Sequence, residues 1–180
     1  MNRDINCINF KGLLAYLRKE YGEQGVKYLV QGLVDNPDYL VADKYDPAKL
    51  RPVSEAHLTD PSYWVSNEFS MQLLANVKKV VPGPNSLYKA GEACIIRELS
   101  RNFLFFVRVF GIKFLAKQAG RVNAKFNRTK EAKLVDMGSN FVTIELTYKP
   151  GFRVTKDVCN WNRGIYAGIG KVVGLNDVKC

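Results

Sequence analysis

The sequence predicts an α+β fold in which helices pack on one face of a small antiparallel sheet. Two observations carry this prediction. Apolar residues recur at three- and four-residue steps through several segments before residue 127, which is helical periodicity. Residues 130–149 then form two runs around a Gly-Ser-Asn turn, the second strictly alternating, which is typical of a β-hairpin. At 180 residues the chain suits a single domain, residues 1–180.

The first part of this domain, residues 1–40, is predicted to be mainly helical. A short extended segment at residues 5–10 is followed by a helix from Lys11 to about Gly22. A second helix runs from Glu23 to about residue 34, before Asn36-Pro37. Residues 41–61 contain three X-Pro pairs and little periodicity, so we expect a long irregular connection there.

The second part, residues 62–180, carries most of the predicted elements. Ser66 is a plausible N-cap of a helix that ends at Pro82-Gly83-Pro84, and a further helix follows from about residue 86. A long helix spans about 102–126, and the hairpin strands span 130–137 and 141–149. The last helix, about 155–173, contains Gly164, Gly168 and Gly170, which permit close packing on a neighbour, and residues 175–180 begin one more strand.

The chain is strongly basic, with 27 Lys and Arg against 17 Asp and Glu and a formal charge of +10. Such a charge favours acidic partners: nucleic acid, an anionic membrane face or an acidic domain. Four basic residues at i, i+4 spacing lie on the long helix: Lys113, Lys117, Arg121 and Lys125. They form either a binding stripe or, more commonly, the solvated side of an amphipathic helix. No nucleic-acid-binding module is recognisable, so nucleic acid is not the leading expectation.

The compartment is predicted to be the cytoplasm. The N-terminus has no secretory signal, and the most apolar stretch, residues 103–115, is interrupted by Arg108 and Lys113, so no membrane span is expected. The four cysteines lie far apart and form no CxxC pair.

Enzymatic motifs are not found in the sequence. The only histidine, His57, lies in the proline-bounded connection without a GxSxG turn, and a loop histidine is usually a surface residue. The glycines near the C-terminus lie in a helical pattern, which fits neither a Walker loop nor a dinucleotide fingerprint. We therefore expect no catalytic residues and no enzyme activity of the domain by itself, and whether the domain binds a cofactor is unknown from these motifs.

Aromatic residues gather in the central helices. Phe103, Phe105 and Phe106 cannot all point the same way, so some must line a pocket, a dimer face or an exposed patch, although most aromatic residues are ordinary core. We predict a site for a hydrophobic or aromatic small molecule between the helices and the sheet. Its predicted ligand-binding residues are Trp64, Phe106, Phe110 and Tyr148.

A metal site is a second possibility at the end of the chain. Cys159, Asp177 and Cys180 are thiolate and carboxylate donors of the kinds that zinc prefers. Distant cysteines are more often buried small hydrophobic residues, so this reading stays open.

The C-terminal segment resembles the 4-vinyl reductase domain family. The resemblance rests on Cys159, Trp161, Gly164, Gly168, Asp177 and Cys180, with Trp64-Val65-Ser66 and Tyr88-Lys89-Ala90-Gly91 upstream. It implies a fold related to TRAPP subunits and haem–nitric oxide sensors, and a role as the small-molecule input domain of an activator, kinase or cyclase. It also implies homodimers and a structural zinc held by two cysteines, the acidic residue and a third cysteine. That third cysteine has no counterpart here, so the zinc site is incomplete and we expect a domain cut before its last hairpin.

Three functional hypotheses follow from these observations. The leading one is a ligand-binding sensory input domain of a bacterial-type signal-transduction protein, joined to an output domain. The alternative is a basic interaction module that uses Lys117, Arg121 and Lys125 to hold an acidic partner or nucleic acid. A reductase-type enzyme ranks last, because no cofactor motif supports it.

Overall fold

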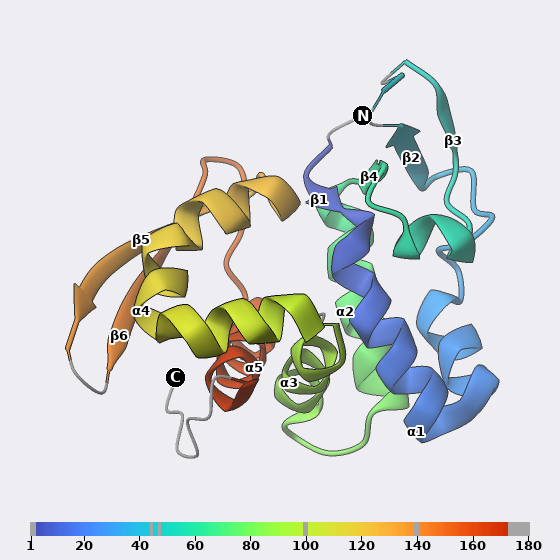
Figure 1. Cartoon of the computed structure of the whole chain (residues 1–180). Coiled ribbons are helices and arrows are strands. Elements are labelled where there is room, and N and C mark those ends of the chain that lie inside the picture. The colour runs from blue at the N-terminus through green and yellow to red at the C-terminus, as the bar shows by residue number, and fades with distance from the viewer. Residues whose placement is uncertain (1–2, 44, 47, 99–100, 139–140, 173–180) are drawn as a thin grey trace.

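The computed structural model describes residues 3–43, 45–46, 48–98, 101–138 and 141–172, and it confirms the predicted α+β fold (Figure 1). Within these residues, five α-helices accompany a four-stranded and a two-stranded antiparallel sheet. In Figure 1, α1 and α2 run side by side below the four-stranded sheet, whereas α4 and the two-stranded sheet lie on the opposite side of the molecule.

The N-terminal part contains β1 (Ile5–Asn6), a 3-10 helix η1 (Cys7–Phe10) and α1 (Lys11–Val30). The predicted pair of helices is confirmed as two segments separated at Gly22, whose φ of 66° interrupts the helical backbone. Glycine adopts this left-handed conformation without the steric cost that a Cβ imposes. The second segment ends at Val30, four residues before the predicted end, because the chain turns at Gly32 with a φ of 73°.

The prediction of an irregular connection at residues 41–61 is wrong. This region contains β2 (Leu40–Asp43), β3 (Leu50–Pro52) and the 3-10 helix η2 (Glu55–Thr59), and β4 (Tyr63–Val65) follows. With β1, these strands form the four-stranded sheet in the order β1-β4-β2-β3. Strands of two to four residues are too short to show alternation, so their pairing left no periodic signal in the sequence.

The predicted helix after Ser66 is confirmed as α2 (Asn67–Val80), and the Ser66 hydroxyl accepts a hydrogen bond from the Phe69 backbone N–H at 3.2 Å. It is followed by α3 (Ser86–Glu98) and, after the hairpin, by α5 (Lys156–Val172). Most of the hydrophobic core comes from α1, α2 and α3. Its fully buried side chains include Leu13, Leu14, Leu17, Val26, Leu29, Phe69, Leu73 and Val77.

Two glycines let α3 approach its neighbours on both sides. A Cβ at Gly12 of α1 would lie 2.3 Å from the carbonyl oxygen of Cys94, and one at Gly164 of α5 would lie 2.1 Å from that of Tyr88. No real Cβ is tolerated at such distances, so both contacts require glycine. The close packing predicted for the glycines of the last helix is therefore confirmed at Gly164.

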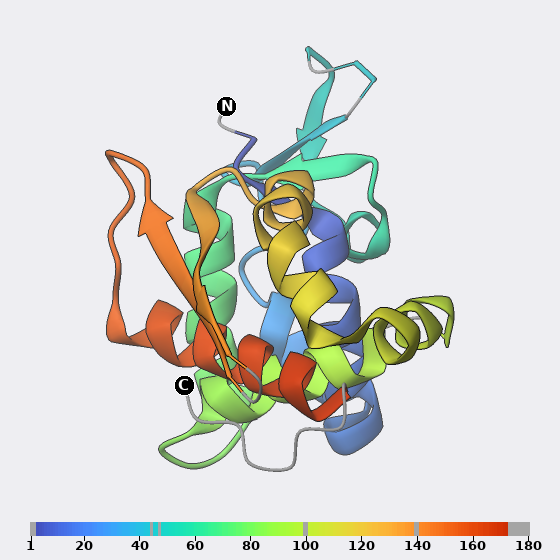
Figure 2. The same cartoon turned by 60° about the vertical axis from the view of Figure 1, so that its left-hand side comes forward.

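The third group of elements consists of α4 (Arg101–Phe126), β5 (Lys130–Met137) and β6 (Val142–Tyr148), close to the predicted ranges. Side chains of β6 alternate between half-buried and exposed, as predicted. The C-terminal half of α4 lies against β5, since a Cβ at Gly120 would be 2.9 Å from the Ala132 carbonyl oxygen. Figure 2 shows the hairpin beside the C-terminal end of α4, whose N-terminal part extends away from it.

No helix in the described ranges combines the length and the apolar character that crossing a bilayer requires. The strand predicted at residues 175–180 lies outside the residues that the structure describes.

Candidate ligand-binding site

Trp64 has a structural position at the centre of the four-stranded sheet. It lies opposite Asn6 of β1 and Ala42 of β2, and it is 5% exposed. The guanidinium of Arg128 covers its ring, with Cζ 4.1 Å from the ring centroid. Because β4 carries Trp64 and the α4–β5 connection carries Arg128, this contact joins the two sheets.

Tyr148, the last residue of β6 in the two-stranded sheet, is in contact with α5. It is half-buried, and its hydroxyl accepts a hydrogen bond from Nδ2 of Asn162 on α5 at 2.8 Å. Phe106 and Phe110 belong to α4, and their side chains lie outside the described ones. The aromatic pocket predicted from these residues with Trp64 therefore stays a prediction.

A cavity of about 300 Å³ lies between the C-terminal half of α4 and β5. No sequence pattern predicted this cavity, because its walls come from residues up to 29 positions apart that only the hairpin brings together. The lining residues are Gly120, Asn123, Ala124, Asn127, Arg128, Lys130, Glu131, Ala132 and Lys149.

Two asparagine side chains fix the shape of this α4–β5 cavity. Nδ2 of Asn123 donates to the Lys130 carbonyl oxygen at 2.7 Å, which ties α4 to the first residue of β5. Oδ1 of Asn127 accepts from both the backbone N–H and the hydroxyl of Thr129, each at 2.8 Å. These hydrogen bonds hold the α4–β5 connection, which forms one wall of the cavity.

The walls of the cavity are rich in positive charge. Arg128 and Lys149 are two lining cations, against the single carboxylate of Glu131, and the third basic lining residue, Lys130, directs its ammonium to Asn162 of α5. Arg128 and Lys149 are exposed, so solvent weakens but does not remove their field. A small molecule with a carboxylate or phosphate group suits this lining better than a wholly apolar one.

Lys130 also belongs to a polar contact between the hairpin and α5. Its ammonium donates to Oδ1 of Asn162, and it lies 5.6 Å from the centroid of the Tyr148 ring. Burial lowers the pKa of Lys130 from 10.5 to about 8, while the neighbouring Cys159 acts in the opposite direction. Burial likewise raises the pKa of Tyr148, an effect that its hydrogen bond with Asn162 partly offsets.

The predicted metal ligands lie only partly within the described structure. Cys159 is an exposed free thiol on α5, whereas Asp177 and Cys180 lie outside the described residues. Within the described ranges, no three His, Cys, Asp or Glu side chains gather in a way that could hold a metal ion. A zinc site built on Cys159, Asp177 and Cys180 stays a prediction.

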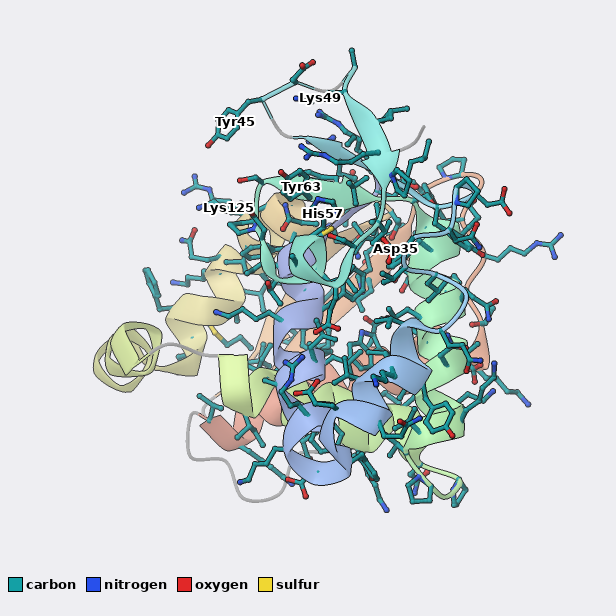
Figure 3. All side chains as sticks on the ribbon, turned by 90° about the vertical axis from the view of Figure 1, so that its right-hand side faces the viewer. Asp35, Tyr45, Lys49, His57, Tyr63 and Lys125 are labelled. Carbon is teal, nitrogen blue, oxygen red and sulfur yellow. The ribbon has the colours of Figure 1, made fainter. Side chains whose placement is uncertain are left out.

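His57 has a local structural role. Its Nδ1 accepts a hydrogen bond from the Ser54 backbone N–H at 3.0 Å, which closes the start of η2, and its ring lies 4.5 Å from that of Tyr63 (Figure 3). Burial lowers the pKa of His57, and the positive charge of Arg51 lowers it further. The neutral, accepting histidine is the form that this capping contact requires.

Comparison with known proteins returned no match, either to a protein family or to an individual curated protein.

Proposed function

We propose that this domain is the small-molecule-binding, sensory input part of a bacterial-type signal-transduction protein, with the α4–β5 cavity as its ligand site. The observation that carries the proposal is a shared residue. Lys130 lines the cavity and also makes the polar contact with Asn162 of α5. A ligand bound in the cavity against β5 would therefore be linked to α5 through a single side chain, that of Lys130.

The contact with α5 is of a kind that a ligand can change. Buried polar contacts stabilise an interface less than well-fitted apolar packing does, because they must offset the cost of desolvation. A ligand that binds one position of the hairpin more tightly than another would shift the population toward that position. The Lys130–Asn162–Tyr148 contact would pass this shift to α5.

A sensory role is also what the expected resemblance of the C-terminal segment to the 4-vinyl reductase domain family implies. We accordingly propose a cytoplasmic homodimer that acts through an output domain. Native mass spectrometry of protein purified from cells would report the subunit count, a retained small molecule and any zinc bound through Cys159.

The cavity assignment is tested by thermal melts across a panel of small carboxylates, phosphate esters and neutral aromatic compounds. We expect at least one anionic compound to raise the melting temperature of the unaltered chain and to lose this effect in Lys149→Glu, whose side chain lines the cavity. Lys133→Glu is the matched control, because Lys133 is an exposed lysine of β5 outside the lining. Flat melts across the panel, or equal losses in both variants, would refute the assignment.

A further inference from the structure

The outer surface of α4 carries positive charge only. Residues 101–126 contain six lysines and arginines and no aspartate or glutamate. Lys113, Lys117, Arg121 and Lys125 are all exposed. Successive members turn by about 40°, so the four form a shallow band about 18 Å long on one side of the helix. We call these four residues the α4 basic band.

The charges of this band have no protein counter-charge among the described residues. None of its four side chains pairs with an aspartate or glutamate there, whereas other surface cations of the protein do. Arg18 binds Glu23 at 2.6 Å, and Lys78 binds Asp157 at 2.9 Å. A row of like charges at i, i+4 spacing destabilises a helix slightly, and an anionic partner would remove that cost.

Exposed apolar side chains lie directly beside the band. Val122 follows Arg121 and is 41% exposed, and Phe126 follows Lys125 and is 36% exposed. Each is about 100° further round the helix than the cation before it, so the apolar surface adjoins the basic one. Figure 3 shows Lys125 at the same upper end of the molecule as Tyr45 and Lys49 of the β2–β3 connection, both exposed.

Three kinds of partner can be compared on this surface. A second copy of the chain, packed through the same face, would bring two rows of like charge together. A nucleic acid would neutralise the cations but leave Val122 and Phe126 in water. An anionic lipid surface suits both the basic band and the adjoining apolar side chains, because its headgroups bind the cations and its acyl boundary buries Val122 and Phe126. We propose that the exposed face of α4 docks on an anionic membrane surface.

This docking goes beyond small-molecule binding and uses other residues, so either can fail alone. Sedimentation with vesicles of phosphatidylcholine containing roughly one-third phosphatidylserine measures it directly. The full chain should bind these vesicles, and should bind pure phosphatidylcholine vesicles at least tenfold more weakly. Each charge removed from the band should weaken binding roughly fivefold. The triple variant Lys117→Gln/Arg121→Gln/Lys125→Gln should therefore lose nearly all binding.

A matched triple variant separates the band from net charge. Lys19→Gln/Lys27→Gln/Lys89→Gln removes the same charge from exposed positions on α1 and α3 and should bind within a few-fold of the unaltered chain. Circular dichroism confirms that each variant is folded. Equal losses in the two triple variants, or no binding of the unaltered chain to anionic vesicles, would overturn the proposal.

A third variant tests the apolar half. Val122→Ser/Phe126→Ser keeps every charge and should still weaken vesicle binding several-fold, most clearly at raised salt, where screening removes the electrostatic part. If this variant binds as well as the unaltered chain, or if a random duplex DNA binds more tightly than the vesicles, the surface is not a lipid-docking face.

Discussion

The guanidinium of Arg128 covers the indole ring of Trp64, with its Cζ atom 4.1 Å from the ring centroid. These residues lie 64 positions apart; Trp64 belongs to β4 of the four-stranded sheet, and Arg128 lies in the connection between α4 and β5. The backbone supports the same junction, because Arg128 N–H donates to the Asp4 carbonyl oxygen at 2.8 Å and Asn127 forms a bridge with Ile5. The junction positions the α4–β5 connection, and with it one wall of the proposed ligand cavity.

Arg128→Ala should destabilise the protein by about 1 kcal/mol, as expected for a cation–π contact at a partly solvated site. Urea denaturation measures the loss, and Arg153→Ala is the control because Arg153 is also an exposed arginine. In a Trp161→Phe background, Trp64 is the one remaining tryptophan, and its fluorescence should report greater solvent access in Arg128→Ala. An unchanged emission spectrum and an unchanged unfolding midpoint would contradict this role.

Asn76 of α2 stabilises the end of α1 from within the core. It is 2% exposed, and its Nδ2 donates to the carbonyl oxygens of Leu29 at 2.8 Å and Gln31 at 3.1 Å. The last carbonyl groups of a helix lack intrahelical donors, so Asn76 supplies a donor at the C-terminal end of α1.

Asn76→Leu should cost about 2–4 kcal/mol, because it removes the side-chain donor from the buried Leu29 carbonyl and the part-buried Gln31 carbonyl. Asn76→Asp should also be destabilising, because it places a carboxylate oxygen against two carbonyl oxygens, although its other oxygen keeps the contact with the Lys79 ammonium. Gln72→Ala, at an exposed position of the same helix, should change stability by less than about 0.5 kcal/mol. Chemical denaturation of the three variants gives the comparison, and similar midpoints for Asn76→Leu and Gln72→Ala would remove the capping role.

The success of the sequence-based prediction depended on how local each signal was. The helix after Ser66 and the 130–149 hairpin were predictable because their caps, turns and periodicity lie within the segment itself. The four-stranded sheet was missed because β4 pairs with β1 and β2, which lie far away in sequence, and each strand has too few residues to alternate.

The candidate site was less predictable for a related reason. Asn123 and Lys149 line one cavity only after the hairpin folds back on α4. Asn123 interrupts an apolar pattern, a signal that could have marked it as a residue with a buried partner. Trp64 and Tyr148 were singled out as large aromatic residues, but Trp64 is covered by Arg128 and Tyr148 binds Asn162.

Gly164 on α5 offers a direct test of the close approach between α3 and α5. Gly164→Ala should destabilise the protein by about 1–3 kcal/mol, since the added Cβ would force the two backbones apart. Alanine otherwise favours a helix over glycine by about 1 kcal/mol, so the sign of the change separates the two effects. Lys156→Ala, at an exposed position of α5, is the control. A higher thermal midpoint for Gly164→Ala would show that α5 does not approach α3 this closely.

The burial of Lys130 predicts a dependence of stability on pH. Its pKa is about 8 in the folded protein, against 10.5 for an ordinary lysine. Between these values the unfolded chain holds a proton that the folded chain has released, so the free energy of unfolding should rise with pH through this window. Below pH 8 both states are protonated, and the cost of burying the charge is fully present. That cost is about 3 kcal/mol for a shift of this size.

Lys130→Met removes the titration while keeping the length and apolar character of the stem. Urea denaturation from pH 7 to pH 10 gives the unfolding free energies of the unaltered chain and of Lys130→Met. As pH rises, the unaltered chain should become steadily more stable relative to Lys130→Met. Using the difference cancels the other titrating groups that the two proteins share. Lys133→Met, at an exposed position of the same strand, should show no such trend. A difference that stays constant across the window would mean that the Lys130 ammonium is solvated, and the polar contact with Asn162 could not then couple the cavity to α5.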